Sequence, residues 1–220
     1  MLFALATPVA FVALVASFLL GILVRATAVR FTAKRLGLAD RHDSVVPRLR
    51  EDIDPFGAVA AAVAGMGWGK MLSVDDVPRY RGRGRAATVF VAGPAACIVL
   101  AQLFFLAYVL AYPGAFLPGP SIVLHGIEGG FGEQILLSLA VGLLSFGLLE
   151  LIPIPPLDGF GIMYYALRRP GAGMQWMRLW FEEKNIGVVI LIVISLFPLG
   201  GPFLLGILNV LGLLFVGLWD

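Results

Sequence analysis

The feature that most constrains this chain is a set of long apolar stretches that carry almost no charge. Residues 3–24 and 86–112 contain no charged side chain, and residues 134–152 contain one. An α-helix rises 1.5 Å per residue, so about 20 residues cross the roughly 30 Å hydrocarbon core of a bilayer. Hydrophobic residues make up 60% of the chain and charged residues only 14%. This composition excludes a soluble globular domain and predicts an integral membrane protein.

The composition also excludes several other classes of protein and of site. The single cysteine, Cys97, allows no disulfide framework and no cysteine metal cluster within one chain. The net charge of +2 gives no reason to expect a nucleic-acid partner. The first basic residue is Arg25, so the first apolar stretch lacks the basic start of a secretory signal and reads as a retained helix. We expect one membrane domain over residues 1–220.

Residues 55–68 have two interpretations. They are apolar but short and rich in small residues, which suits either a short span or a re-entrant piece. The flanking loops 37–54 and 70–85 both carry arginines, and basic loops are typical of the cytoplasmic side. A crossing would put these loops on opposite sides, so we favour the re-entrant form. Residues 113–130 contain no Lys or Arg and are expected on the outer face.

The C-terminal part of the chain continues the helical pattern. A short helix near residues 162–169 is expected to lead to the cytoplasmic face. Residues 174–184 predict an interfacial helix, because Trp176, Trp180 and the flanking charges suit the headgroup layer. Residues 186–218 predict a helical hairpin split by the sequence PLGGP. The predicted fold is an all-α, multi-pass protein of the cell (cytoplasmic) membrane, with five or six transmembrane helices and a cytoplasmic C-terminus.

The most specific local feature is the sequence PIPPLDG at residues 153–159. Prolines stop a helix and leave backbone groups without partners. Within a bilayer such groups are tolerated only where protein or water covers them. An aspartate at the same break, Asp158, is costly unless it has a partner. The break therefore marks a candidate site.

Five short motifs occur in order along the chain: RLG at 35–37, IDPFG at 53–57, WGK at 68–70, VAGP at 91–94 and LIPIPPLDG at 151–159. Together they resemble the motifs of the site-2 protease family, the zinc intramembrane metalloproteases, in its compact bacterial branch. Their order and spacing are similar to those of the family over about residues 18–168, which implies a protease-like core. The motif residues expected to maintain this scaffold are Asp54, Pro55, Gly57, Gly93, Pro94, Pro153, Pro155, Pro156 and Gly159.

The sequence departs from the family pattern at the residues that would bind the metal and carry out catalysis. Residues 25–29, RATAV, stand where the family has the zinc-binding His-Glu-x-x-His. Asp52 replaces a family histidine, Cys97 and Glu150 replace family asparagines, and only Asp158 matches. The two histidines of the chain, His42 and His125, belong to no such motif. The resemblance therefore implies a catalytically degenerate member with no catalytic residue, no metal ligand set and no zinc cofactor.

We expect Arg25 to take the place of the metal and to form a charge cluster with Asp158, Glu150 or both, because buried charges in a membrane need partners. The alternative is that Arg25 extends to the cytoplasmic interface. Asp158 could also cap the helix that begins near Gly159. Glu150 could accept hydrogen bonds from backbone at the break, or belong to a proton path.

The remaining polar features have simpler expectations. His42 is expected to be a solvated loop residue, His125 lacks partner ligands, and Cys97 suits helix packing. The RGRGR run at residues 81–85 either binds anionic lipid headgroups or is a solvated loop that orients the protein. Trp176 and Trp180 are expected to anchor the chain at the interface first and to offer a partner surface second.

The sequence thus predicts a non-enzymatic membrane protein with an inactive protease-like scaffold. It would be an accessory, assembly or stabilising subunit of a larger membrane complex, and it would contact lipids and, through its transmembrane helices, a partner membrane protein. Two alternatives stay open. One is an intramembrane metalloprotease with non-standard ligands from His42, His125, Asp52 or Glu150. The other is a proton or solute pathway through Glu150, Asp158 and Arg25.

Overall fold

A computed structural model describes residues 1–39, 44–196 and 203–219 of the chain. This part is helical and contains no β-strand beyond one isolated bridge. The order of its elements is η1 (Leu2–Ala6), α1 (Pro8–Arg35), α2 (Leu49–Asp52), α3 (Pro55–Ala64), η2 (Arg79–Arg81), α4 (Arg83–Ala111), α5 (Pro120–Leu124), α6 (Phe131–Glu150), α7 (Asp158–Ala166), α8 (Ala172–Met177), the π-helical η3 (Arg178–Glu183), α9 (Ile186–Leu196) and α10 (Phe203–Val216).

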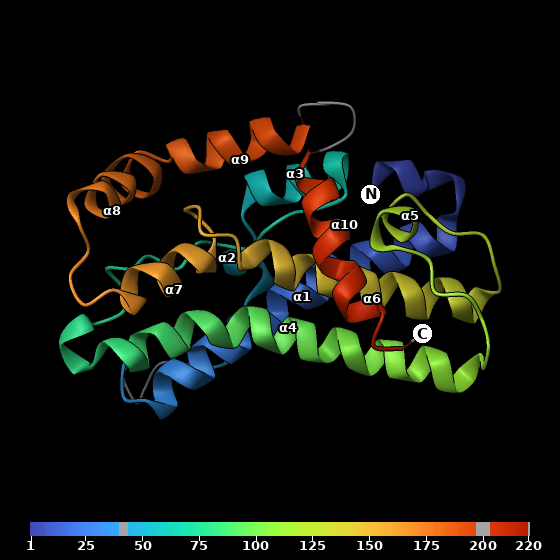
Figure 1. Cartoon of the computed structure of the whole chain (residues 1–220), viewed down its shortest axis with the longest axis horizontal. Helices are drawn as coiled ribbons and strands as arrows, with labels where there is room; N and C mark the ends of the chain where they lie inside the picture. Colours follow the sequence, from blue (N-terminus) through green and yellow to red (C-terminus); the bar gives the residue numbers. More distant parts are fainter. Residues whose placement is uncertain (40–43, 197–202, 220) are drawn as a thin grey trace.

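Three long helices form the centre of the molecule. Helices α1, α4 and α6 each pack against the other two, and they run along the long axis in Figure 1. These three helices are long and apolar enough to cross a membrane, and they correspond to the three longest predicted stretches. The membrane character expected from the sequence is therefore supported, whereas the expected count of five or six spans is not confirmed.

Small residues allow the long helices to approach one another closely. A side chain added at Gly147 of α6 would place its Cβ 3.0 Å from the carbonyl oxygen of Pro94 in α4. A Cβ at Gly21 of α1 would lie 3.0 Å from the ring of Phe146. Membrane helices associate through such close packing, since lipid provides little hydrophobic drive between them. The core therefore lies between α1, α4 and α6.

The chain around α3 turns back to the place where it starts. Asp54 caps α3 by accepting the amide of Phe56 at 2.8 Å, and it also accepts the indole N–H of Trp68 at 3.1 Å. Ile53 and Gly69 form the isolated antiparallel bridge. Residues 54–68 therefore begin and end side by side, and segments 44–53 and 70–81 lie together at this point.

The C-terminal elements differ in detail from the prediction. The helix expected at 162–169 is α7, which starts at Asp158 and ends at Ala166. The interfacial helix expected at 174–184 is α8 continued by η3, over residues 172–183. Helices α9 and α10 contact each other, and α10 also packs on α5 and α6. The PLGGP break predicted between them lies outside the described residues.

Candidate functional site

The candidate site is a buried charge cluster where α1, α6 and α7 meet. It joins Arg25 of α1, Glu150 at the last position of α6 and Asp158 at the first position of α7. The three residues are 6%, 1% and 1% exposed. The fold thus brings together the three residues in which the sequence predicts a charge cluster.

Arg25 binds Asp158 at two points. Its Nε donates to Asp158 Oδ2 at 2.7 Å, and its Nη2 donates to Oδ1 at 2.6 Å. Its Nη1 donates to the carbonyl oxygen of Lys70 at 2.8 Å. Two parallel hydrogen bonds between guanidinium and carboxylate are the strongest arrangement for this pair. Arg25 therefore points into the protein.

Glu150 has a different role from Asp158. Its Oε1 lies 3.4 Å from Arg25 Nε and accepts the amide of Gly69 at 3.2 Å. Its Oε2 accepts the amide of Asp158 at 3.4 Å. Glu150 therefore satisfies backbone groups on both sides of the cluster, including the first amide of α7. Asp158 does not cap its own helix, because its carboxylate is directed to Arg25.

Residues of the short motifs surround this cluster. A Cβ at Gly93 of α4 would lie 2.7 Å from Arg25 Cγ and 3.2 Å from Asp158 Oδ2, so only glycine leaves room for the ion pair. Pro94 follows inside α4. The prolines 153, 155 and 156 separate α6 from α7, and Gly159 lies against the backbone of Leu151 and Ile152. The IDPFG and WGK motifs meet at the bridge between Ile53 and Gly69.

A second ion pair, which sequence patterns do not predict, lies beside the cluster. Asp52, which replaces a family histidine, is buried and pairs with Arg30, one and a half turns after Arg25 on α1. Asp52 also accepts the amide of Arg48 at 2.8 Å. Arg30 and Asp52 are separated by 22 positions in the sequence. Their pairing depends on how the loop after α1 folds back, and no local sequence pattern encodes this.

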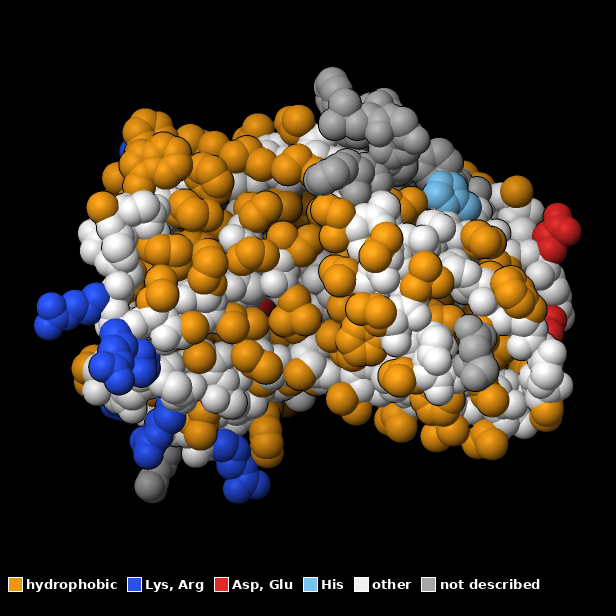
Figure 2. All heavy atoms as spheres, in the orientation of Figure 1, with side chains coloured by type: hydrophobic (Ala, Val, Ile, Leu, Met, Phe, Trp, Pro, Cys, Tyr) orange, Lys and Arg blue, Asp and Glu red, His pale blue; other side chains and the backbone are white. Residues whose placement is uncertain are grey.

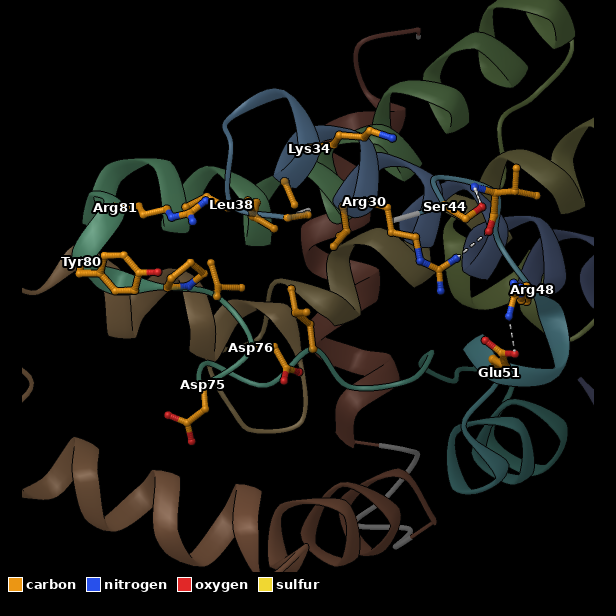
Figure 3. A pocket seen from close by; sticks show the side chains of 18 residues that line it. Arg30, Lys34, Leu38, Ser44, Arg48, Glu51, Asp75, Asp76, Tyr80 and Arg81 are labelled. Carbon is orange, nitrogen blue, oxygen red and sulfur yellow. Dashed lines mark hydrogen bonds and ion pairs between the residues drawn. The ribbon is translucent and has the colours of Figure 1, made fainter. Parts of the chain in front are cut away.

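Two adjoining clefts lead toward the cluster from the end of α1. The outer one, shown in Figure 3, has a volume of about 670 Å³. Figure 3 shows Lys34 and Arg81 on one side of it and Asp75 and Asp76 on the other. The inner cleft, of about 220 Å³, reaches Arg25. The two share Val29, Arg30, Glu51, Leu72 and Asp76 in their walls.

The other polar candidates lie apart from the cluster or support it. His125 is an exposed residue at the end of α5, and its Nδ1 lies 2.6 Å from the carbonyl oxygen of Ser121. His42 lies outside the described residues. Cys97 is buried in α4, and its Sγ donates to the carbonyl oxygen of Gly21 at 3.5 Å.

The family that the chain resembles holds a zinc ion at this place, and the residues present in this chain do not fit one. Zinc requires several histidine, cysteine or carboxylate ligands that are not engaged elsewhere. Both oxygens of Asp158 accept from Arg25, whose positive charge opposes a dication. In the part of the chain that the structure describes, no group of three or more His, Cys, Asp or Glu residues could hold a metal ion.

Comparison with known proteins identifies the family. No family model matches the chain, and no solved structure matches it. A protein of Bacillus subtilis (strain 168), named "Putative zinc metalloprotease YwhC", is 31% identical over 159 residues. The match covers 71% of this chain and 67% of that relative. The chain therefore belongs to the zinc metalloprotease family represented by YwhC.

Proposed function

We propose that this protein is a non-enzymatic member of its family and acts as an accessory, assembly or stabilising subunit of a larger membrane protein complex. The observation that carries the proposal is the ion pair between Arg25 and Asp158. It occupies the position that the resemblance assigns to the metal, and it replaces a dication by a guanidinium. The scaffold would then keep its fold without the metal and without proteolytic activity.

The arrangement of the cluster supports a structural role for these charges. A zinc protease needs an ion that lowers the pKa of a bound water and a carboxylate that takes its proton. Here Asp158 is saturated by Arg25, and Glu150 accepts two backbone amides. Each charged group thus joins separate segments of the chain, which fits a rigid connection between α1, α6 and α7.

The surface of the long helices supports a partner within the membrane. Helix α4 exposes Val99, Leu103 and Leu110 along its length. In a bilayer this face would contact lipid or the transmembrane helix of another protein. A protease of this family has to accommodate a transmembrane substrate, and a scaffold that has lost its metal could hold such a helix without cleaving it.

The proposal is tested by extracting the tagged protein from its own membranes in mild detergent. We expect a membrane protein to co-purify in fixed ratio, and we expect this ratio to survive in a Glu150→Gln variant that keeps the Arg25–Asp158 pair. Recovery of the folded protein alone would contradict the subunit role. Proton or solute flux in liposomes that is lost with Glu150→Gln would instead favour the pathway alternative.

A further inference from the structure

One end of the protein gathers basic side chains from separate parts of the sequence. Figure 2 shows Lys and Arg at one end of the long axis and Asp and Glu at the other. The basic residues come from the last turn of α1, the end of η2, the start of α4 and the segment after α7. This set, called the basic patch, consists of the exposed residues Lys34, Arg35, Arg81, Arg83, Arg85, Arg168 and Arg169.

Hydrogen bonds hold these segments together. The guanidinium of Arg81 donates to the carbonyl oxygen of Gly37, just after α1. Arg83 Nη1 donates to the carbonyl oxygen of Ala166 at the end of α7 at 3.3 Å. Lys34 and Arg81 line the same cleft (Figure 3). The basic patch is therefore one built surface that spans three helices.

Helix α8 lies at the same end of the molecule as the start of α4 in Figure 1, and α8 and η3 carry two exposed tryptophans. Met174 and Met177 pack against a buried cluster, whereas Trp176 and Trp180 are 53% and 43% exposed. Their ring centroids are 6.0 Å apart. Exposed tryptophans of this kind favour the boundary between headgroups and hydrocarbon. Trp176 and Trp180 are called the tryptophan face below.

The position of two arginines cannot be explained by helix stability. Arg83 and Arg85 occupy the first turn of α4, where the backbone dipole disfavours cations. This turn has no acidic residue, and its N-cap, Gly82, provides no side-chain hydrogen bond. Exposed residues that are unfavourable for the stability of their helix are expected to serve a function. The positive charges are therefore suited to an external anion.

The location of the basic patch identifies that anion. Lys34 and Arg35 end one candidate span, and Arg83 and Arg85 begin another, so all four lie at headgroup depth. We propose that the basic patch and the tryptophan face together bind anionic phospholipid headgroups in the adjoining leaflet. Polybasic surfaces attract anionic lipids in this way.

The test measures which lipid stays with the full-length protein. The purified protein is exchanged into mixed micelles with equal amounts of phosphatidylcholine and phosphatidylglycerol, and the lipid that remains bound is quantified. We expect phosphatidylglycerol to be enriched. The variant Arg83→Gln/Arg85→Gln should reduce the enrichment about tenfold or more, because each basic residue near an anionic surface contributes about a factor of five. The charge-preserving variant Arg83→Lys/Arg85→Lys should retain it.

The matched control removes two arginines elsewhere, in Arg48→Gln/Arg50→Gln, and should keep the enrichment. Thermal melting in neutral detergent should show that Arg83→Gln/Arg85→Gln remains folded, since cations leave the N-terminus of α4. Equal loss in the control would overturn the proposal by showing a non-specific effect of net charge. Absence of enrichment in the wild type would overturn it, as would displacement of the lipid by inorganic phosphate, which would indicate a site for a soluble anion.

Discussion

Arg25 and Asp158 lie 133 residues apart in the chain, and their side chains form a two-point ion pair in the interior of the protein. The pair joins the first long helix to the helix that follows the proline-rich break. Removal of one partner of a buried pair leaves an uncompensated charge, which costs far more than the pair itself contributes. The stability of the fold is therefore expected to depend on both partners of the pair.

Replacement of Arg25 by alanine should destabilise the protein strongly. It would leave the carboxylates of Asp158 and Glu150 buried without a cation, at a cost of about 3–5 kcal/mol. The measurement is the melting midpoint and the yield of monodisperse protein in detergent. The control is Arg48→Ala, because Arg48 forms an exposed pair with Glu51 and such pairs contribute about 0–1 kcal/mol. Similar behaviour of the two variants would show that the Arg25 pair does not hold the core together.

The two carboxylates should differ in their sensitivity to neutral substitution. Asp158→Asn replaces an acceptor of two guanidinium hydrogen bonds by an amide that can accept only one of them. Glu150→Gln keeps an oxygen for backbone amides, and it brings a cluster of one cation and two carboxylates to electrical neutrality. We expect Asp158→Asn to lower the melting midpoint more than Glu150→Gln does. The reverse order would contradict the assignment of Asp158 as the principal partner of Arg25.

Gly93 should be intolerant of even one methyl group. The added Cβ would lie 2.7 Å from Arg25 Cγ, and overpacking of this kind costs about 1–3 kcal/mol. The matched control lies on the same helix, because a Cβ at Gly84 would meet nothing within 4 Å. Gly84→Ala should be neutral or stabilising by up to about 1 kcal/mol, since alanine favours a helix. Thermal melting of both variants would refute the prediction if Gly93→Ala were as stable as Gly84→Ala.

Glu182 should make stability depend on pH. Its Oε1 accepts the hydroxyl of Ser73 and the amide of Val74, whereas its buried Oε2 has no partner among the described residues. Burial raises the pKa of this carboxyl above its usual value of 4.5. The folded protein therefore holds the proton to higher pH than the unfolded chain does, so the stability contributed by this group is lost as pH rises through the raised pKa.

The corresponding experiment compares melting midpoints across pH for the wild type and Glu182→Gln. The advantage of the variant over the wild type should grow as pH rises above about 4.5, and it should then level off above the raised pKa. Glu183→Gln is the control, because Glu183 is exposed and pairs with Arg178 at 3.3 Å. A difference between wild type and Glu182→Gln that stays constant with pH would refute the raised pKa.

Much of the fold follows from local patterns in the sequence. Uncharged apolar runs predict α1, α4 and α6, because their length matches a bilayer. Asp54 followed by Pro55 marks the start of α3, since aspartate caps a helix and proline suits its first turn. Helix boundaries differ by a few residues: α7 begins at Asp158, next to the start expected near Gly159 and four residues before the start expected near residue 162.

The contacts of the site were only partly accessible from sequence. A buried arginine in a membrane helix needs a carboxylate partner. This requirement is enough to predict Asp158 or Glu150 as the partner of Arg25. Which carboxylate binds Arg25 and which accepts backbone amides depends on the path of residues 151–157. This path brings the amide of Asp158 to Glu150. The contact of Arg25 with the carbonyl oxygen of Lys70 and the pair between Arg30 and Asp52 depend on how residues 44–70 fold back against α1, and no local pattern specifies them.

We propose that Arg25 stands where the family holds its metal, and the zinc content of the protein tests this. The protein is purified in detergent and passed over a size-exclusion column without chelator. We predict less than about one tenth of a zinc ion per chain, and a melting midpoint that does not change when a strong chelator is added. One zinc ion per chain, removed by the chelator with loss of stability, would show that the site holds a metal and that Arg25 does not replace it.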